Sequence, residues 1–191
     1  MIGRKGSCGG GEMTRYDRKI SNLATIFRDA VKAVQDAGGF DDDETFRAFP
    51  EQCCGETCML LAEFLRTNGI ETIYVCGQDE GAGTHAWLVV KDERINSQSQ
   101  YLDVPDEVAT ALYDYSGGVC SNRIDITHYE ESDLIDGLIV DITGEQFKQQ
   151  PVYVGYSNDF YDEYEFMAAY DHDGVHDARL MNLYDQIMEQ L

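Results

Sequence analysis

Apolar residues recur at three- and four-residue steps in three stretches of the chain, and each stretch predicts an amphipathic helix. The first covers residues 14–38 and ends at a Gly-Gly pair. The second begins at Cys54 and stops at Asn68-Gly69, a pair suited to the left-handed end of a helix. The third covers residues 177–191. The region between the second and third helices has a different pattern.

Shorter apolar runs in that region predict β-strands. One run covers residues 70–76, and another covers residues 85–91, with His85 at its start. Residues 137–143 form a near-continuous apolar run, which is typical of an interior strand, and residues 151–155 form a further short one. The pattern predicts an α+β fold in which an antiparallel sheet packs against the central helix.

Residues 101–136 interrupt this order of elements. Within them we expect a short helix near 107–113 and a strand at 123–127. Residues 1–13 are polar and glycine-rich, which predicts a loose arm and does not resemble a secretory signal. We expect a single domain over residues 1–191, with 101–136 as an insertion into its core.

Composition narrows the partners that such a domain can have. The formal charge is −22, from 36 acidic and 14 basic residues, so we expect no nucleic-acid partner and favour a basic peptide or protein. No stretch approaches the roughly 20 apolar residues of a membrane span. The six cysteines are unevenly placed in a chain well above the size of disulfide scaffolds. We therefore expect free thiols and a cytoplasmic protein without a membrane partner.

Three residues have the chemistry of a thiol enzyme. Cys54 lies at the start of a helix, where unpaired N–H groups and the helix dipole stabilise a thiolate. His85 begins one strand and Asp141 lies in another, and adjacent antiparallel strands about 4.8 Å apart can hold them side by side. A thiol needs a base, and the imidazole in turn needs an acceptor that fixes its tautomer. The three side chains are therefore candidates for one site.

The same residues resemble the core of the transglutaminase-like branch of the papain-like superfamily, most of all its small bacterial and phage members. The resemblance covers residues 49–155 apart from the insertion, and it rests on Cys54-Gly55-Glu56-Thr57-Cys58, His85-Ala86-Trp87 and Asp141-Ile142-Thr143. It implies a papain-like fold with a Cys-His-Asp triad: Cys54 as nucleophile, His85 as general base and then acid, and Asp141 as the residue that orients His85. The implied activity is acyl chemistry on a peptide or protein amide, by hydrolysis or by transfer to an amine. No cofactor or metal is implied.

Several alternatives remain open at this stage. Cys53 is the rival nucleophile, and Gln52 is a candidate donor to an oxyanion. A zinc site has suitable ligand types but lacks the paired spacing of structural zinc sites; its ligands would be Cys54, Cys58, Cys76 and His85. By strand alternation we expect Trp87 to point to the face opposite His85. A different class of function is a non-catalytic acidic protein that captures a basic partner or mimics nucleic acid.

Overall fold

The computed structural model describes residues 13–93, 95, 98–103, 123–134, 136–172 and 174–191. Its helices are α1 (Arg15–Asp36), α2 (Cys54–Thr67), α4 (Glu131–Leu134), α5 (Asp159–Asp162) and α6 (Ala178–Met188), with 3₁₀ turns η1 (Phe46–Ala48) and η2 (Gly144–Phe147). Its strands are β1 (Thr72–Asp79), β2 (Gly83–Val90), β3 (Gln98–Asp103), β4 (Arg123–His128), β5 (Ile139–Asp141), β6 (Tyr153–Gly155) and β7 (Glu165–Asp171).

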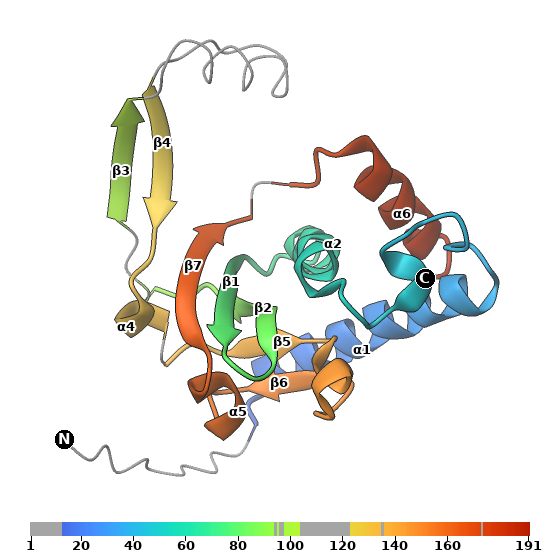
Figure 1. Ribbon diagram of the computed structural model, residues 1–191, viewed down its shortest axis with the longest axis horizontal. Helices are drawn as coiled ribbons and strands as arrows, with labels where there is room; N and C mark the ends of the chain where they lie inside the picture. The colour runs from blue at the N-terminus through green and yellow to red at the C-terminus, as the bar shows by residue number, and fades with distance from the viewer. Residues whose placement is uncertain (1–12, 94, 96–97, 104–122, 135, 173) are drawn as a thin grey trace.

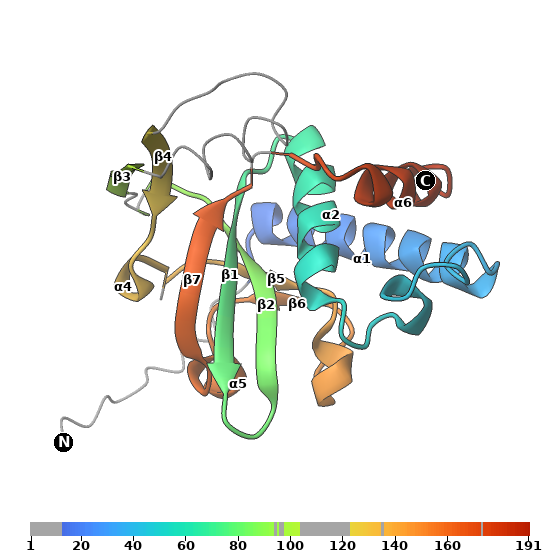
Figure 2. The same ribbon diagram turned by 45° about the horizontal axis from the view of Figure 1, so that its top comes forward.

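A five-stranded sheet with the order β6-β5-β2-β1-β7 is the centre of the fold, and every pairing in it is antiparallel. The helices α1, α2 and α6 lie together on one face of this sheet (Figure 1; Figure 2). β2 is the middle strand, flanked by β1 and β5. The expected α+β class and the expected packing of the sheet against the central helix are confirmed. Among the described residues, no helix is long and apolar enough to cross a membrane.

The helix boundaries follow from local chemistry. α1 is preceded by a capping box in which the Thr14 hydroxyl accepts from the backbone N–H of Asp17 and the Asp17 carboxylate accepts from the backbone N–H of Thr14. α2 begins at Cys54, as expected, and its chain leaves through Gly69, whose φ of 74° is left-handed. The start of α2 therefore lies where the sequence places it.

The central strand separates two hydrophobic clusters. Ala86, Leu88 and Val90 face α1 and α2 and belong to the larger cluster. Trp87 and Val89, on the other side of β2, belong to a smaller cluster with side chains from α4, α5 and β7. Because successive strand residues alternate between faces, His85 lies on the same side as Trp87.

The hairpin that carries His85 is longer than expected. β1 and β2 pair from Thr72↔Val90 to Asp79↔Gly83, so the turn between them is only residues 80–82. His85 is consequently the third residue of its strand and not the first. The eight residue pairs between β1 and β2 include Gly77↔His85, so they hold the backbone of His85 inside the sheet.

The described strands at the edges of the insertion, β3 and β4, lie beside the five-stranded sheet. β3 and β4 pair as a two-stranded ribbon, which confirms the strand expected at 123–127 (Figure 1). Tyr129, the residue after β4, joins this ribbon to β7 through a hydrogen bond from its Oη to Asp171 Oδ1 at 2.7 Å. Lys91 Nζ donates to the same oxygen at 2.8 Å. The helix expected near 107–113 and the arm expected at 1–13 lie outside the described residues, except for Met13.

We expect Phe27→Ala to destabilise the protein by about 3–5 kcal/mol. Phe27 is fully buried and stacks on Phe64 of α2, with 5.1 Å between ring centroids, so its loss leaves a cavity where the two helices meet. Urea unfolding followed by circular dichroism measures the effect. Ile26→Ala is the matched control, because Ile26 is the preceding helix residue and is 48% exposed. Equal midpoints for the two variants would contradict this packing.

Candidate active site

Cys54 is the first residue of α2, and its side chain is half-buried. The first backbone hydrogen bond of the helix is from Thr57 N to Cys53 O, at 2.8 Å, so the N–H groups of Cys54 to Glu56 precede the helical ladder. Such N–H groups carry the positive end of the helix dipole. An anion on Cys54 Sγ or on a carbonyl oxygen beside it would be stabilised there.

His85 and Asp141 meet on the opposite side of the same site. His85 Nε2 and Asp141 Oδ2 are 2.8 Å apart, and both side chains are completely buried. β2 and β5 pair with Leu88 opposite Val140, and this register continues to place Asp141 across from Trp87. His85 and Asp141 are thus diagonal neighbours on one face of the sheet, close enough for their side chains to touch.

The Asp141 carboxylate accepts hydrogen bonds at both oxygens. Oδ1 accepts from Thr143 N at 2.7 Å and from Thr143 Oγ1 at 3.0 Å. Oδ2 accepts from Tyr161 Oη at 3.1 Å and shares the 2.8 Å contact with His85. These donors replace the water that a buried carboxylate loses.

The electrostatics of the site favour a thiolate beside an imidazolium. Burial of the Cys54 thiol raises its pKa. The His85 side chain and the N–H groups of Ala86 and Gly55 stabilise the thiolate more than burial opposes it, so the pKa of Cys54 is lowered. Burial alone would lower the pKa of His85, whereas Asp141 and Cys54 raise this pKa to about 9. Each partner therefore stabilises the charged form of the other.

One nitrogen of His85 is left for the thiol. Nε2 is engaged by Asp141, while Nδ1 is buried and has no hydrogen-bond partner among the described residues. The contact of Cys54 with the ring is therefore looser than a formed S–H···N hydrogen bond. Catalytic hydrogen bonds are often long in ligand-free enzymes and tighten when substrate binds. Nδ1 is the position from which His85 can take and return a proton.

The neighbouring cysteines have different surroundings. Cys53 is buried, and burial raises the pKa of its thiol to about 12 even though Thr57 Oγ1 donates to its sulfur. Cys58 is also buried, and desolvation raises its pKa well above that of a free thiol. Geometry and charge thus favour Cys54 over Cys53 as the reactive thiol. Among the residues that the structure describes, no group of three or more His, Cys, Asp or Glu side chains has the arrangement of a metal site, so the zinc alternative has no support there.

Gln52 connects the two loops that form the site. It is exposed and takes a left-handed backbone conformation, with φ of 58°, two residues before Cys54. Its N–H donates to Gln146 Oε1 at 3.3 Å, and Gln146 Nε2 donates to Thr143 O at 3.1 Å. The backbone of Gln52 therefore ties the cysteine loop to the loop after Asp141, and only its side-chain amide is left as a candidate oxyanion donor.

Aromatic rings surround the imidazole. The centroids of Phe147, Tyr164 and Phe160 lie 4.8, 5.7 and 5.9 Å from that of His85. Trp87 lies 5.8 Å away on the same face of β2, so the expectation that it points to the opposite face is wrong. Residues two apart in a strand share a face. The rings exclude water from the His85–Asp141 pair and strengthen its interaction.

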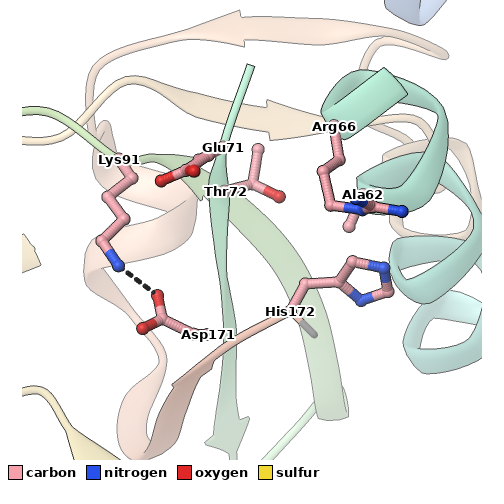
Figure 3. Close-up of a pocket in the computed structure, with 7 residues that line it drawn as sticks. All are labelled: Ala62, Arg66, Glu71, Thr72, Lys91, Asp171 and His172. Atoms are coloured by element: carbon pink, nitrogen blue, oxygen red, sulfur yellow. Dashed lines mark hydrogen bonds and ion pairs between the residues drawn. The ribbon is translucent and has the colours of Figure 1, made fainter. Parts of the chain in front are cut away.

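A separate pocket of about 210 Å³ lies at the other end of α2 (Figure 3). It is lined by Ala62, Arg66, Glu71, Thr72, Lys91, Asp171 and His172. Lys91 pairs with Asp171 at 2.8 Å, and Arg66 pairs with Glu63 at 2.7 Å, so these charges are satisfied within the protein. The pocket contains none of Cys54, His85 and Asp141, and it is not the candidate site.

Sequence reasoning found the three central side chains but missed one that touches them. Tyr161 belongs to an aromatic run between residues 153 and 166, which on sequence alone could line a substrate cleft but by default fills space against the sheet. Its hydroxyl contact with Asp141 has no local sequence signal, because α5 and β5 come together only in the fold. Comparisons of the chain with models of protein families, with curated proteins and with solved structures find no match.

We expect iodoacetamide to modify Cys54 at pH 6 roughly tenfold or more faster than an ordinary thiol, and His85→Ala to remove the advantage. The imidazolium that stabilises the thiolate is present below the His85 pKa of about 9, so the difference between wild type and variant should narrow as pH rises through that value. Peptide mapping by mass spectrometry locates the modified cysteine. Cys76→Ala, which removes another half-buried thiol, is the control and should label like wild type. Equal rates for wild type and His85→Ala would rule out an activated thiol.

Proposed function

We propose that this protein is a cysteine hydrolase or acyltransferase with a papain-like, transglutaminase-like core and a Cys54-His85-Asp141 triad. The observation that carries the proposal is the buried His85–Asp141 hydrogen bond of 2.8 Å beside a cysteine at a helix start. A buried histidine bonded to a carboxylate can also be purely structural. Here, however, the same histidine lowers the pKa of a half-buried thiol, which a structural pair has no reason to do.

The first half of the reaction forms a thioester. Cys54 Sγ, as the thiolate, attacks the carbonyl carbon of an amide, and the carbonyl oxygen becomes an oxyanion that N–H groups at the start of α2 can stabilise. The C–N bond then breaks as the His85 imidazolium gives its proton to the leaving nitrogen. Asp141 holds the ring so that one nitrogen faces the thiol throughout.

The second half returns the enzyme to its starting state. A water molecule or an amine attacks the thioester carbon while His85 takes its proton, and the C–S bond breaks to regenerate the thiolate. Water gives a protease, amidase or deamidase, and an amine gives a transglutaminase-type acyltransferase. Both outcomes use the same three side chains and differ only in which acceptor reaches the thioester.

The test is to incubate the wild-type protein with casein and a fluorescent primary amine. New peptide fragments indicate proteolysis, ammonia release alone indicates deamidation, and ammonia release with incorporation of the amine indicates transfer. We expect Cys54→Ala and His85→Ala each to lower the active rate about 10³-fold or more, because nucleophile and base act as a unit. Cys76→Ala should keep wild-type activity. A rate unaffected by Cys54→Ala would exclude the proposed nucleophile.

Acidic side chains next to the site support a basic substrate. Asp159, Asp162, Glu163 and Glu165 are exposed on the segment that also carries Phe160, Tyr161 and Tyr164. Phe160 and Tyr164 pack against the His85 ring, so this acidic segment borders the catalytic residues. A chain of net charge −22 adds a long-range field of the same sign.

We expect peptides with lysines flanking the reactive amide to react faster than matched peptides with glutamates. The preference for the lysine peptides should weaken as the salt concentration rises from about 0.05 to about 1 M, because the Debye length falls to about 3 Å at the higher concentration. Measurement of kcat/KM for the two peptides at each salt concentration checks this. Replacing Asp159 and Glu163 with Asn and Gln should reduce the preference. An unchanged ratio at all salt concentrations would show that charge does not select the substrate.

A further inference from the structure

Tyr161 and His85 share one oxygen of the Asp141 carboxylate. Tyr161 Oη donates to Oδ2 at 3.1 Å, and His85 Nε2 lies 2.8 Å from the same atom. Thr143 supplies both of its donors to the other oxygen, Oδ1. The position of the carboxylate is therefore already fixed by Thr143, and the bond from Tyr161 has a different consequence.

The Tyr161 hydroxyl is built into this position. Asn158 caps α5 by accepting from the N–H of Phe160, which sets the orientation of this short turn. The Tyr161 ring packs against three other aromatic rings. Its centroid lies 5.4 Å from that of Trp87, 5.1 Å from that of Tyr153 and 4.9 Å from that of Phe160. Tyr161 is only 5% exposed, and burial together with the charge of Asp141 raises its pKa, so its hydroxyl stays protonated and acts as a donor.

We propose that Tyr161 is a positioning residue that acts through Asp141, weakening the hold of the carboxylate on the protonated imidazole so that His85 can release its proton to the leaving group. A hydroxyl that donates to Oδ2 withdraws negative charge from the oxygen that binds His85 Nε2. Without this donor, Asp141 stabilises the imidazolium more strongly. A more stable imidazolium is a weaker general acid.

Other titratable groups also face this pair. Cys54 and Cys58 come from α2, and the charge of Asp141 is felt by Cys58 as well as by Tyr161. Tyr164 precedes β7 and lies against the His85 ring, where burial raises its pKa to about 12. These groups are the same in wild type and in a Tyr161 variant, so a change in the titration of His85 on substitution reports the Tyr161 hydroxyl.

The experiment is a pH titration of His85 by NMR with ¹⁵N-labelled histidine. The chain has four histidines, and loss of a signal in His85→Ala assigns the resonance. We expect Tyr161→Phe to raise the pKa of the His85 imidazolium by roughly half to one unit, the scale of one hydrogen bond to a charged group. Tyr153→Phe is the matched control, because that hydroxyl donates to the backbone of Tyr156 and not to Asp141. It should leave the His85 titration unchanged.

A second substitution tests the opposite direction. Site-specific 3-fluorotyrosine at position 161 keeps the ring and makes the hydroxyl a stronger donor, so it should lower the His85 pKa. It also keeps the test open if Tyr161→Phe does not fold. A lower pKa in Tyr161→Phe, or a titration identical to that of Tyr153→Phe, would overturn the assignment.

This inference rests on the proposed function, and the two fail differently. If wild-type Cys54 is no more reactive at pH 6 than an ordinary thiol and His85 titrates near its ordinary value of about 6.5, the enzyme proposal itself fails. If Cys54 is reactive and the pKa of His85 is raised in the wild type, but neither Tyr161 variant changes that pKa, only the proposed role of Tyr161 fails.

Discussion

The fold depends on keeping a histidine and an aspartate paired inside the protein. Both side chains are completely buried, and a buried charge without a partner costs several kcal/mol. The 2.8 Å bond between them exists only in one register of β2 and β5, because a slip of one residue would turn Asp141 to the face covered by α1 and α2. The pair that is proposed to do the chemistry therefore also specifies how the central strands align.

The thiol meets this pair because the start of α2 lies against β2. The His85 side chain and the N–H of Ala86, both on β2, favour the ionised form of Cys54 at the start of α2, so the two elements act on each other at the site itself. The Gln52–Gln146–Thr143 hydrogen bonds add a second link, between the loop before α2 and the loop after β5. Sheet, helix and loops thus converge on a few atoms, and a shift in any of them would separate the sulfur from the imidazole.

Local patterns in the sequence predicted what depends on neighbours along the chain. The helix start at Cys54, the glycine stop and the strands with His85 and Asp141 all follow from periodicity and caps. The expectation for Trp87 is wrong because Trp87 lies two residues after His85, and residues two apart in a strand share a face. Tyr161 could not be found, because its bond to Asp141 joins residues 20 apart whose relation is set by the path of the chain between β5 and α5. Hydrogen bonds between distant segments leave no periodic signal.

The acidity of the chain raises the question of how an anionic thiolate can be stable in it. A net charge of −22 opposes every additional negative charge, and the site already contains the carboxylate of Asp141. Surface charges farther than about 8 Å are largely screened at physiological salt, whereas the donors at the site act at hydrogen-bond distance inside a region shielded from water. At Cys54, burial is therefore outweighed by the His85 side chain and by the N–H groups of Ala86 and Gly55, which together lower the pKa of the thiol. The proposed function, with a cysteine nucleophile and a cationic substrate, is therefore compatible with an acidic surface, because the surface charges act on the approaching partner more than on Cys54.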